Sequence, residues 1–284
     1  MTSSINPQIF REYDIRGIVG QDLTAESVAS IGKAIGTYIK RGGGKTMIIG
    51  RDVRTSSIEF RDILSNALNS TGCDVIDIGM VPTPVTYFAL HHFKADGGVM
   101  ITGSHNPPEY NGFKISQGVH SLYGEKVQEL KRLIDANDFE IGTGNTNQRE
   151  VLGHYMEKIC SILKISRKVK VVVDGGNGCF GIVGPDLLRK LGQNPIELFS
   201  EPDGTFPNHH PDPTVTEHLT HLIAKVRSEN AELGIGFDGD ADRIGVVDEK
   251  GNILWGDQLL TIFARDILSR NPGATIVGEV KCSQ

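Results

Sequence analysis

Three aspartates that alternate with small residues form the strongest chemical signal in the sequence. Asp238, Asp240 and Asp242 lie in the run GFDGDADR (236–243), and Arg243 follows them directly. On a helix these carboxylates would point in different directions, and on a strand they would share one face and repel one another. In a glycine-containing loop between two strands they can converge on one cation, and oxygen ligands alone suit Mg²⁺ or Ca²⁺.

Two other interpretations of this run must be weighed. An EF-hand calcium loop could use Glu249 as its last ligand, but its sixth position requires glycine and here is Arg243, and the flanking residues have strand patterns. A solvated acidic turn is the second alternative, although three close carboxylates repel unless a cation offsets the charge. Because Arg243 can bind a phosphate and Mg²⁺ keeps positions open for phosphate oxygens, the run indicates phosphoryl chemistry.

A serine beside a histidine closes an apolar run earlier in the chain. Residues 97–108 read GGVMITGSHNPP, so Ser104 and His105 lie between a buried-strand pattern and two prolines. A nucleophilic serine needs an activating partner or a metal, and the sequence has neither a GxSxG elbow nor a Ser/His/Asp order. Taken alone, Ser104 is best interpreted as an ordinary loop serine.

A glycine pattern at 176–181, GNGCFG, matches the dinucleotide fingerprint GxGxxG. It follows a predicted strand, and Glu197 lies about 20 residues further on, as in nicotinamide-binding proteins. Glycine is common at tight strand-to-helix turns, and the chain contains 34 glycines. We therefore interpret the pattern as such a turn, and a nicotinamide-dependent oxidoreductase stays as an alternative function.

Strand and helix patterns alternate along the chain, as in α/β proteins. Apolar runs predict strands at 46–50, 73–80, 97–102, 169–174, 196–199, 232–237, 243–247 and 274–280. Amphipathic spacing predicts helices at 23–40 with Thr24 as N-cap, 56–70, from Thr83 or Thr86 to 92, 124–135, 151–163, 185–191, 216–229 and 257–270. We expect tandem three-layer α/β/α domains with mixed, mostly parallel sheets.

The polar, non-periodic segment 141–150 predicts a linker or domain boundary. The expected organisation is a first domain at 1–150 with the serine loop, a second at 151–253 with the aspartate run, and the beginning of a third at 254–284.

Composition excludes several classes of protein. A net charge of −6 argues against a nucleic-acid partner, because such proteins usually present a basic stripe. The four cysteines form no CxxC pair, so neither a disulfide framework nor a zinc motif is indicated. The N-terminus has no apolar signal segment, and no apolar run approaches the roughly 18 residues of a membrane span. We expect a cytoplasmic protein without a membrane partner.

Considered together, these motifs resemble those of the α-D-phosphohexomutases, in particular bacterial phosphomannomutase/phosphoglucomutase. The resemblance rests on TGSHNPPEYNGFK (102–114) and GFDGDADR (236–243), and extends to FREYDIRG (10–17), GRDVRTSS (50–57) and FPNHHPDP (206–213). The motifs follow the family's order from residue 10 to the C-terminus. The phosphoglucosamine mutase branch is also similar, but it typically reads SASHNP with DGDGDR, so the first subgroup is favoured.

The resemblance implies a Mg²⁺-dependent interconversion of hexose 1-phosphates and 6-phosphates of mannose or glucose. Ser104 would carry the phosphoryl group and ligate Mg²⁺ together with Asp238, Asp240 and Asp242. A bisphosphorylated sugar would turn over between two transfers, with glucose 1,6-bisphosphate as activator. Arg243 would stabilise the transferring group, His105 and Lys114 would lie near the acid/base step, and Tyr13, Arg16 and Asn106 would line the phosphate-binding site. Arg51 could belong to the site or to a surface salt bridge.

Members of this family normally have four domains, and the chain contains motifs of only the first two. We therefore expect an N-terminal fragment that keeps the serine loop and the metal site but does not turn over hexose phosphates. It should expose apolar surface around Leu259, Leu260, Ile262 and Phe263. A phosphosugar-binding module without catalysis is a further alternative, and the preference among glucose, mannose and glucosamine stays open.

Overall fold

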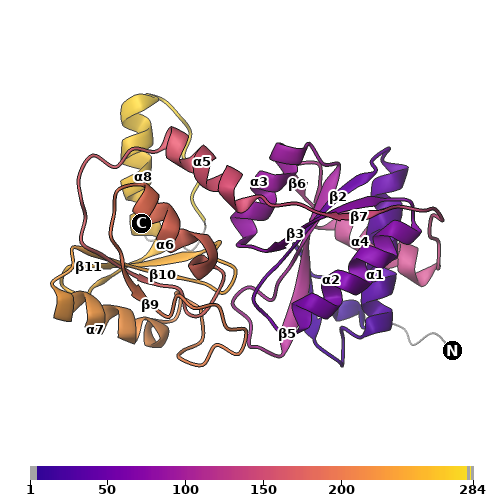
Figure 1. Cartoon of the computed structure of the whole chain (residues 1–284), viewed down its shortest axis with the longest axis horizontal. Helices are drawn as coiled ribbons and strands as arrows, with labels where there is room; N and C mark the ends of the chain where they lie inside the picture. The colour runs from indigo at the N-terminus through magenta and orange to yellow at the C-terminus, as the bar shows by residue number, and fades with distance from the viewer. Residues whose placement is uncertain (1–4, 280–281, 283–284) are drawn as a thin grey trace.

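Two α/β lobes lie side by side in the computed structural model, which describes residues 5–279 and 282 (Figure 1). The first lobe contains η1 (Pro7–Ile9), β1 (Ile15–Ile18), α1 (Ala25–Arg41), β2 (Thr46–Arg51), α2 (Ser56–Ser70), β3 (Asp74–Met80), α3 (Thr83–Phe93), β4 (Gly97–Ile101), β5 (Tyr110–Gln117), β6 (His120–Ser121), α4 (Glu125–Asp135) and β7 (Thr146–Gln148). The second contains β8 (Val171–Asp174), α6 (Phe180–Lys190), β9 (Ile196–Leu198), η2 (Thr216–Leu219), α7 (Thr220–Glu229), β10 (Leu233–Phe237), β11 (Ile244–Asp248) and β12 (Ile253–Leu254). Helix α5 (Leu152–Ile162) precedes the second lobe, and α8 (Gly256–Arg270) follows it.

The sheet of the first lobe has the order β1-β5-β4-β2-β3-β7, with β6 paired to β5. Strand β2 is parallel to β3 and β4, whereas β5 is antiparallel to β1 and β4. No helix separates β4 from β5, so the chain reverses through the loop that carries Ser104. The β4–β5 register places Met100 opposite Lys114, which brings Lys114 close to the base of that loop.

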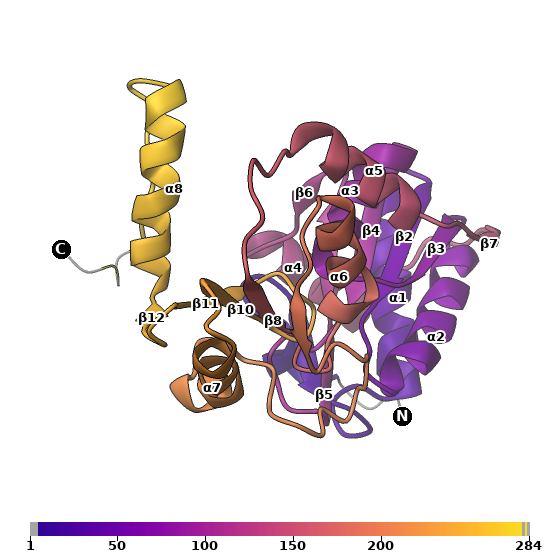
Figure 2. The same ribbon diagram turned by 60° about the vertical axis from the view of Figure 1, so that its left-hand side comes forward.

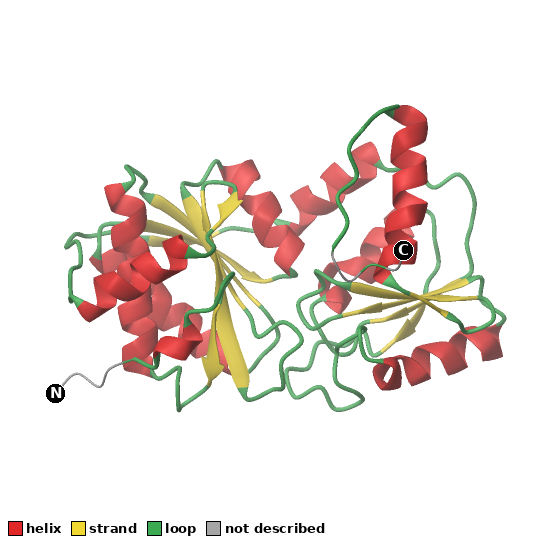
Figure 3. Ribbon diagram, turned by 180° about the vertical axis from the view of Figure 1, so that it is seen from behind, coloured by secondary structure: helices red, strands yellow, loops and turns green. Residues whose placement is uncertain are grey.

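Helices cover both faces of this sheet, giving three layers (Figure 3). Successive side chains of β2 point to opposite faces of the sheet. Met47 and Ile49 pack with α1, α2 and α4 on one face, and Ile48 packs with α3 on the other. Thr24 caps α1 as predicted, with its side chain accepting a hydrogen bond from the amide of Ser27.

The sheet of the second lobe has the order β12-β11-β10-β8-β9. Strand β8 is parallel to β9 and β10, and β10, β11 and β12 are antiparallel neighbours. Helix α7 packs on one face through Leu222 and Val226, and α6 packs on the other through Phe180, whose ring stacks on Phe237. The expected mixed α/β/α architecture is confirmed, with more antiparallel pairs than the alternation of elements suggested.

Three local predictions are wrong. Residues 146–148, expected within a linker, form strand β7 and pair in parallel with the edge strand β3. Thr83 does not cap α3, since the N-cap is Pro82 and Thr83 is the first helical residue, and Thr86 lies inside the helix. Residues 274–279 form no strand, and residue 280 lies outside the described residues.

Helix α8 stands apart from the second lobe (Figure 2). None of its residues is buried, and Ile262 and Phe263 are 49% and 55% exposed, as expected from the sequence, while Leu259 and Leu260 are partly covered. Within residues 5–279, no helix combines the length and the apolar character needed to cross a membrane.

Candidate active site

The serine loop and the aspartate loop meet between the two lobes. The Ser104 hydroxyl donates a hydrogen bond to Oδ2 of Asp238 at 2.9 Å, although the two residues are 134 positions apart. Both side chains are buried, with 1% and 0% exposure. Each loop begins at the C-terminal end of a strand, β4 for the serine and β10 for the aspartate. The folding of both sheets therefore determines the contact.

Ser104 has a backbone conformation that non-glycine residues rarely adopt. Its φ is +51°, in the left-handed region, and its amide donates to the Thr102 hydroxyl at 2.8 Å. Such conformations cost free energy and persist only where the surroundings enforce them. The surroundings of the serine loop therefore hold Ser104 in this geometry.

The three aspartates converge as their spacing predicted. One carboxylate oxygen from each of Asp238, Asp240 and Asp242 lies within 4.8 Å of the others. The turn is closed by Asp238, whose Oδ1 accepts from the amides of Asp242 and Arg243, both at 3.0 Å.

The glycine-rich turn at 175–179 packs against the backbone of the aspartate loop. It joins β8 to α6, so the interpretation of the GxGxxG pattern as a strand-to-helix turn is confirmed. The Cys179 amide donates to the carbonyl of Gly239 at 2.9 Å, and a Cβ on Gly178 would lie only 2.7 Å from that oxygen. Glycine at 178 is therefore needed for the close approach of the two backbones.

Asp240 connects the aspartate loop to the first lobe. Its Oδ2 accepts from the Thr83 hydroxyl at 2.5 Å and from the Lys114 ammonium at 2.6 Å, and Lys114 also contacts Asp242 at 2.5 Å. Its Oδ1 is buried and has no hydrogen-bond partner among the described residues. A buried, unpartnered carboxylate oxygen costs free energy, and a cation among the three aspartates would satisfy it.

Burial and the adjacent charges change the proton affinity of these groups. Burial, with the charges of Asp240 and Asp242, raises the pKa of Asp238 to about 8. Burial acts in the same direction on Asp240, but Lys114 and the Thr83 hydroxyl outweigh it and lower the pKa of that carboxyl. Burial lowers the pKa of Lys114, yet its two aspartate partners outweigh this and raise it. The ammonium form of Lys114 is thereby stabilised.

His105 and Arg243 lie against each other beside the serine. Arg243 Nη1 lies 3.0 Å from His105 Nδ1, and the Ser104 hydroxyl lies 3.3 Å from the same nitrogen. A guanidinium can only donate, so Nδ1 is the acceptor and the proton of the neutral imidazole resides on Nε2. Burial, followed by the charge of Arg243, lowers the pKa of His105, which favours this neutral form.

A cavity of about 330 Å³ opens over Ser104. Its walls come from both lobes: Tyr13, Asp14, Arg16, Tyr87, Ser104, Lys114, Ile115, Ser121, Asp242 and Arg243. Three cationic side chains, Arg16, Lys114 and Arg243, face this space, which favours an anionic ligand. Tyr13 lies at the mouth with 74% exposure. Of these, the sequence analysis missed Asp14, Tyr87, Ile115 and Ser121.

Arg16, on the cavity wall, is hydrogen-bonded to Asn106 of the serine loop. The guanidinium of Arg16 donates to Asp14 at 2.5 Å and to the side-chain oxygen of Asn106. Its Nε is buried and has no hydrogen-bond partner among the described residues.

The run at 50–57 contributes a different arginine from the one considered. Arg51 donates to the carbonyl of Asp52 and is not among the described cavity-lining residues. Arg54, three residues further on, is 1% exposed and reaches the backbone of the serine loop. The sequence contained no signal that distinguished Arg54 from Arg51, because both lie in the same run beside Asp52.

The histidine run at 206–213 also contacts the serine loop. His210 Nε2 lies 2.5 Å from the carbonyl of His105, and His209 lies between the carboxylate of Asp174 at 3.1 Å and the carbonyl of His210 at 3.0 Å. The burial of His209 is outweighed by Asp174, which raises the pKa of the imidazole. The contact of His210 joins the second lobe to the serine loop, and the contacts of His209 hold the histidine run within the second lobe.

Comparison with known proteins gives a consistent family assignment. The sequence model of phosphoglucomutase/phosphomannomutase alpha/beta/alpha domain I matches residues 7–140, and that of domain II matches residues 153–251. The chain therefore belongs to the phosphoglucomutase/phosphomannomutase family.

Individual relatives support the same assignment. Phosphomannomutase/phosphoglucomutase of Pseudomonas aeruginosa is 49% identical over 276 residues, covering 97% of this chain and 60% of the relative. Phosphoglucomutase of Neisseria meningitidis serogroup B is 43% identical over 284 residues, covering 99% of this chain and 62% of the relative. The crystal structure of a phosphoglucomutase/phosphomannomutase family protein from Burkholderia thailandensis superposes with a TM-score of 0.92 at 44% identity, covering 95% of this chain and 61% of that one. The chain thus spans about 60% of the length of these relatives.

Proposed function

We propose that this chain carries the phosphoserine and metal-binding part of a hexose-phosphate mutase, which interconverts the 1-phosphates and 6-phosphates of mannose or glucose. The observation that carries the proposal is the hydrogen bond from Ser104 to Asp238 at the floor of a cation-lined cavity. This hydrogen bond places a nucleophile candidate, a cluster of oxygen ligands and a cation-lined cavity at one point. The names of the relatives, phosphomannomutase/phosphoglucomutase and phosphoglucomutase, favour hexose phosphates as substrates.

The aspartate cluster fits a divalent cation. All donors are oxygens, the ligand atoms of the three aspartates lie within 4.8 Å of one another, and Asp240 Oδ1 is otherwise unpartnered among the described residues. Asp238, Asp240, Asp242 and the phosphorylated Ser104 would hold Mg²⁺. When bound, Mg²⁺ supplies positive charge that offsets the charge on the transferring phosphoryl group.

The proposed reaction consists of two phosphoryl transfers. A sugar hydroxyl attacks the phosphorus of phosphoserine 104, the bond from phosphorus to Oγ breaks, and the hydroxyl proton passes to a base while Oγ acquires a proton. The bisphosphorylated sugar then turns over in the site. Ser104 Oγ attacks the phosphorus of its other phosphate, so that the phosphoserine is restored and the sugar oxygen takes up a proton.

The side chains around the cavity fit distinct roles in these steps. Lys114 presents an ammonium next to the aspartates and is the candidate for delivering a proton at the acid/base step. His105 has its Nδ1 engaged by Arg243, so we assign it to orienting that guanidinium toward the transferring group. Arg16, with Asn106 beside it, and Tyr13 would bind the phosphate of the substrate that is not being transferred.

Because the chain spans about 60% of its relatives, turnover is proposed for the complete protein. Residues 1–284 alone should accept a phosphoryl group on Ser104 without interconverting sugar phosphates. A coupled assay of the purified chain with mannose 1-phosphate and glucose 1-phosphate tests this, and turnover at rates typical of the relatives would contradict it.

The serine's role is tested by incubating the chain with Mg²⁺ and glucose 1,6-bisphosphate and measuring its intact mass. The expected result is one added phosphoryl group, mapped to Ser104, that is lost in Ser104→Ala. Ser65→Ala is the matched control, because Ser65 is a buried serine of α2 outside the site. A chain that binds the sugar bisphosphate without forming an adduct would instead be a phosphosugar-binding module.

A further inference from the structure

We propose that Arg54, paired with Asp52, is a positioning residue that holds the serine loop in the conformation presenting the Ser104 hydroxyl. This inference deepens the proposed function and rests on it. It concerns a residue outside the cavity, which acts on the reaction through the backbone of the loop rather than through contact with substrate.

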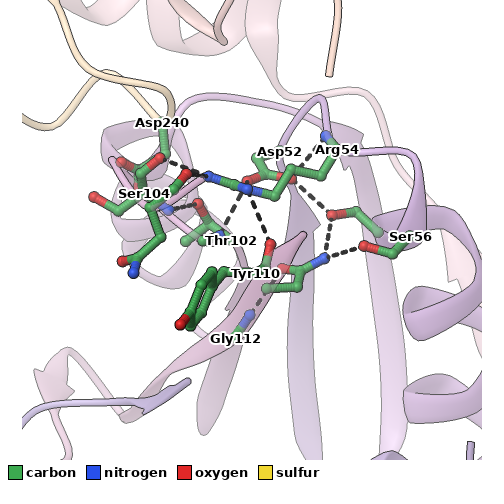
Figure 4. Close-up of polar contacts among 12 residues, drawn as sticks. Asp52, Arg54, Ser56, Thr102, Ser104, Tyr110, Gly112 and Asp240 are labelled. Atoms are coloured by element: carbon green, nitrogen blue, oxygen red, sulfur yellow. Dashed lines mark hydrogen bonds and ion pairs between the residues drawn. The ribbon is translucent and has the colours of Figure 1, made fainter. Parts of the chain in front are cut away.

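Arg54 donates hydrogen bonds through every N–H of its guanidinium (Figure 4). Nε donates to Asp52 Oδ2 at 3.1 Å. Nη1 donates to the carbonyls of Pro107 at 2.6 Å and Tyr110 at 2.9 Å. Nη2 donates to the carbonyls of Ser104 at 3.0 Å and Asn106 at 2.6 Å. One side chain thus fixes four carbonyls of the loop that reverses the chain between β4 and β5.

Asp52 holds the same loop from its other end. Its Oδ2 accepts from the amide of Gly103 at 3.2 Å as well as from Arg54. Its Oδ1 accepts from the Ser57 hydroxyl at 2.7 Å and from the Arg54 amide at 3.0 Å. The residue before Ser104 and the carbonyl of Ser104 itself are therefore both attached to one buried ion pair.

The ion pair explains two features of the serine loop. Ser104 has a φ of +51°, and fixing the groups on either side of it provides the constraint that such a conformation requires. Gly103 leaves room for the guanidinium, since a Cβ at this position would lie 2.5 Å from Arg54 Cζ. The second lobe completes the enclosure, because the ring of Phe206 lies 5.3 Å from Arg54 Cζ.

The geometry requires arginine rather than any cation. A lysine ammonium offers three donors at one point, whereas the four carbonyls and Asp52 are reached by a planar fork with five donors. A buried ion pair is in itself weak support for stability, because desolvation offsets much of the attraction. A role in positioning accounts better for a fully buried arginine with its donors directed at one loop.

The test compares Arg54→Lys with Arg61→Lys in the full 284-residue chain. Arg61 is the matched control, because it forms ion pairs with Asp62 and Asp77 in the same lobe and none of its hydrogen bonds within residues 5–279 goes to the serine loop. Phosphoryl transfer from glucose 1,6-bisphosphate to Ser104 is timed by intact mass. We expect Arg54→Lys to slow it about 100-fold, since misplacing a reacting group by about 1 Å has effects of that order, and Arg61→Lys to leave it within about twofold.

Two further readouts separate positioning from general damage. Mg²⁺ affinity, measured by titration calorimetry, should change by less than about threefold in Arg54→Lys, because the aspartates stay in place. Arg54→Ala should regain about tenfold in rate with millimolar guanidinium, far below denaturing concentrations, while Arg61→Ala gains nothing. Transfer by Arg54→Lys at the wild-type rate would overturn the proposal.

The loop can also be followed without any reaction. Hydrogen exchange of the peptide spanning 102–112 should be faster in Arg54→Lys than in the wild-type chain, and unchanged in Arg61→Lys. If Arg54→Lys does not fold, Asp52→Asn replaces it, and the same increase in exchange is expected. If the wild-type chain accepts no phosphoryl group, the proposed function fails, while this exchange still decides whether Arg54 holds the loop. Unchanged exchange in both variants would overturn the inference on its own.

Discussion

Single residues at this site are distinguished by which of their polar atoms already have partners. Asp238 uses both carboxylate oxygens in hydrogen bonds within the protein, to Ser104 and to two loop amides. Asp240 uses only Oδ2, and its Oδ1 is buried without a partner in the described chain. Asp240 is therefore the aspartate for which a bound cation would make the largest difference.

Asp240→Asn should weaken Mg²⁺ binding by at least about tenfold, because it removes a buried anionic ligand from the cluster. Titration calorimetry on the purified chain measures this effect. Asp248→Asn serves as the control, since Asp248 lies at the end of β11 and bonds Asn252 and Lys250 in a surface turn. Equal affinities in both variants would mean that the aspartate run is only an acidic turn.

Thr83→Val should destabilise the chain by about 1.5–3 kcal/mol, the usual contribution of a hydrogen bond to a charged group. The Thr83 hydroxyl donates to Asp240 at 2.5 Å, is fully buried, and has nearly the shape of valine. Thr86→Val on the same helix is the matched control, because its hydroxyl donates to the Met100 sulfur at 3.3 Å rather than to a carboxylate. Urea denaturation measures the unfolding free energy of both variants. Equal losses in the two would argue against a stabilising hydrogen bond from Thr83 to Asp240.

At the scale of elements, the site is made by loops at strand ends that are held together across the two sheets. The loop after β4 carries Ser104, the loop after β10 carries the aspartates, and the turn after β8 supports the latter. The run at 206–213 adds His209 and His210, which reach Asp174 and the carbonyl of His105. Each loop is thus positioned by a rigid strand, and each is attached to another loop.

His209 makes the stability of this arrangement depend on pH. Although burial opposes it, Asp174 raises the pKa of His209 above its unfolded value, which is about 6.5. The resulting stabilisation is fully present below that unfolded pKa and is lost as pH rises through the folded pKa. His209→Gln should therefore cost more unfolding free energy at about pH 5.5 than at about pH 8.5.

Urea denaturation at both pH values measures this difference, with His120→Gln as control because His120 is exposed on β6. Of the other groups around His209, the ring of His221 lies 6.0 Å away and that of Phe199 lies 5.4 Å away. A cost that is the same at both pH values, or larger at high pH, would show that the contact with Asp174 is not charged.

At the scale of the whole molecule, the site exists only where the lobes touch. The amide of Thr83 donates to the carbonyl of Asp240, and a Cβ on Gly204 would meet the carbonyl of Val53 at 2.4 Å. Phe206 lies over Arg54 in the same region. By contrast, α8 projects from the second lobe (Figure 2), and its Ile262 and Phe263 are exposed.

The exposed residues of α8 should make the chain bind apolar dyes and self-associate. Replacing Ile262 and Phe263 by glutamate should lower 8-anilinonaphthalene-1-sulfonate fluorescence and the apparent mass by light scattering, while unfolding free energy changes by less than about 0.5 kcal/mol. Ile141→Glu is the control, because Ile141 is 94% exposed but isolated in the first lobe. Unchanged dye binding in the double variant would contradict this expectation.

Local patterns were sufficient for much of the fold. The period of apolar residues predicted the main helices and the strands β2, β3, β4, β8, β10 and β11, and Thr24 was correctly predicted as an N-cap. Strands β1 and β5 were not predicted, although β5 lies inside the first sheet. The predictions failed where distant partners decide the outcome. Thr146–Gln148 has no apolar alternation and becomes a strand because the edge of β3 is available, whereas 274–279 has a strand-like pattern but pairs with no strand of the described chain.

The sequence by itself determined the chemistry that is available: three carboxylates close enough to share a cation, and a serine, histidine and lysine in recognisable motifs. Only the tertiary structure decided that Ser104 bonds Asp238 and that Arg54, not Arg51, reaches the serine loop. The physical reason is the sequence separation of the partners. Spacing along the chain governs which side chains share a loop or a face, but contacts across 134 residues depend on how two sheets and their helices pack.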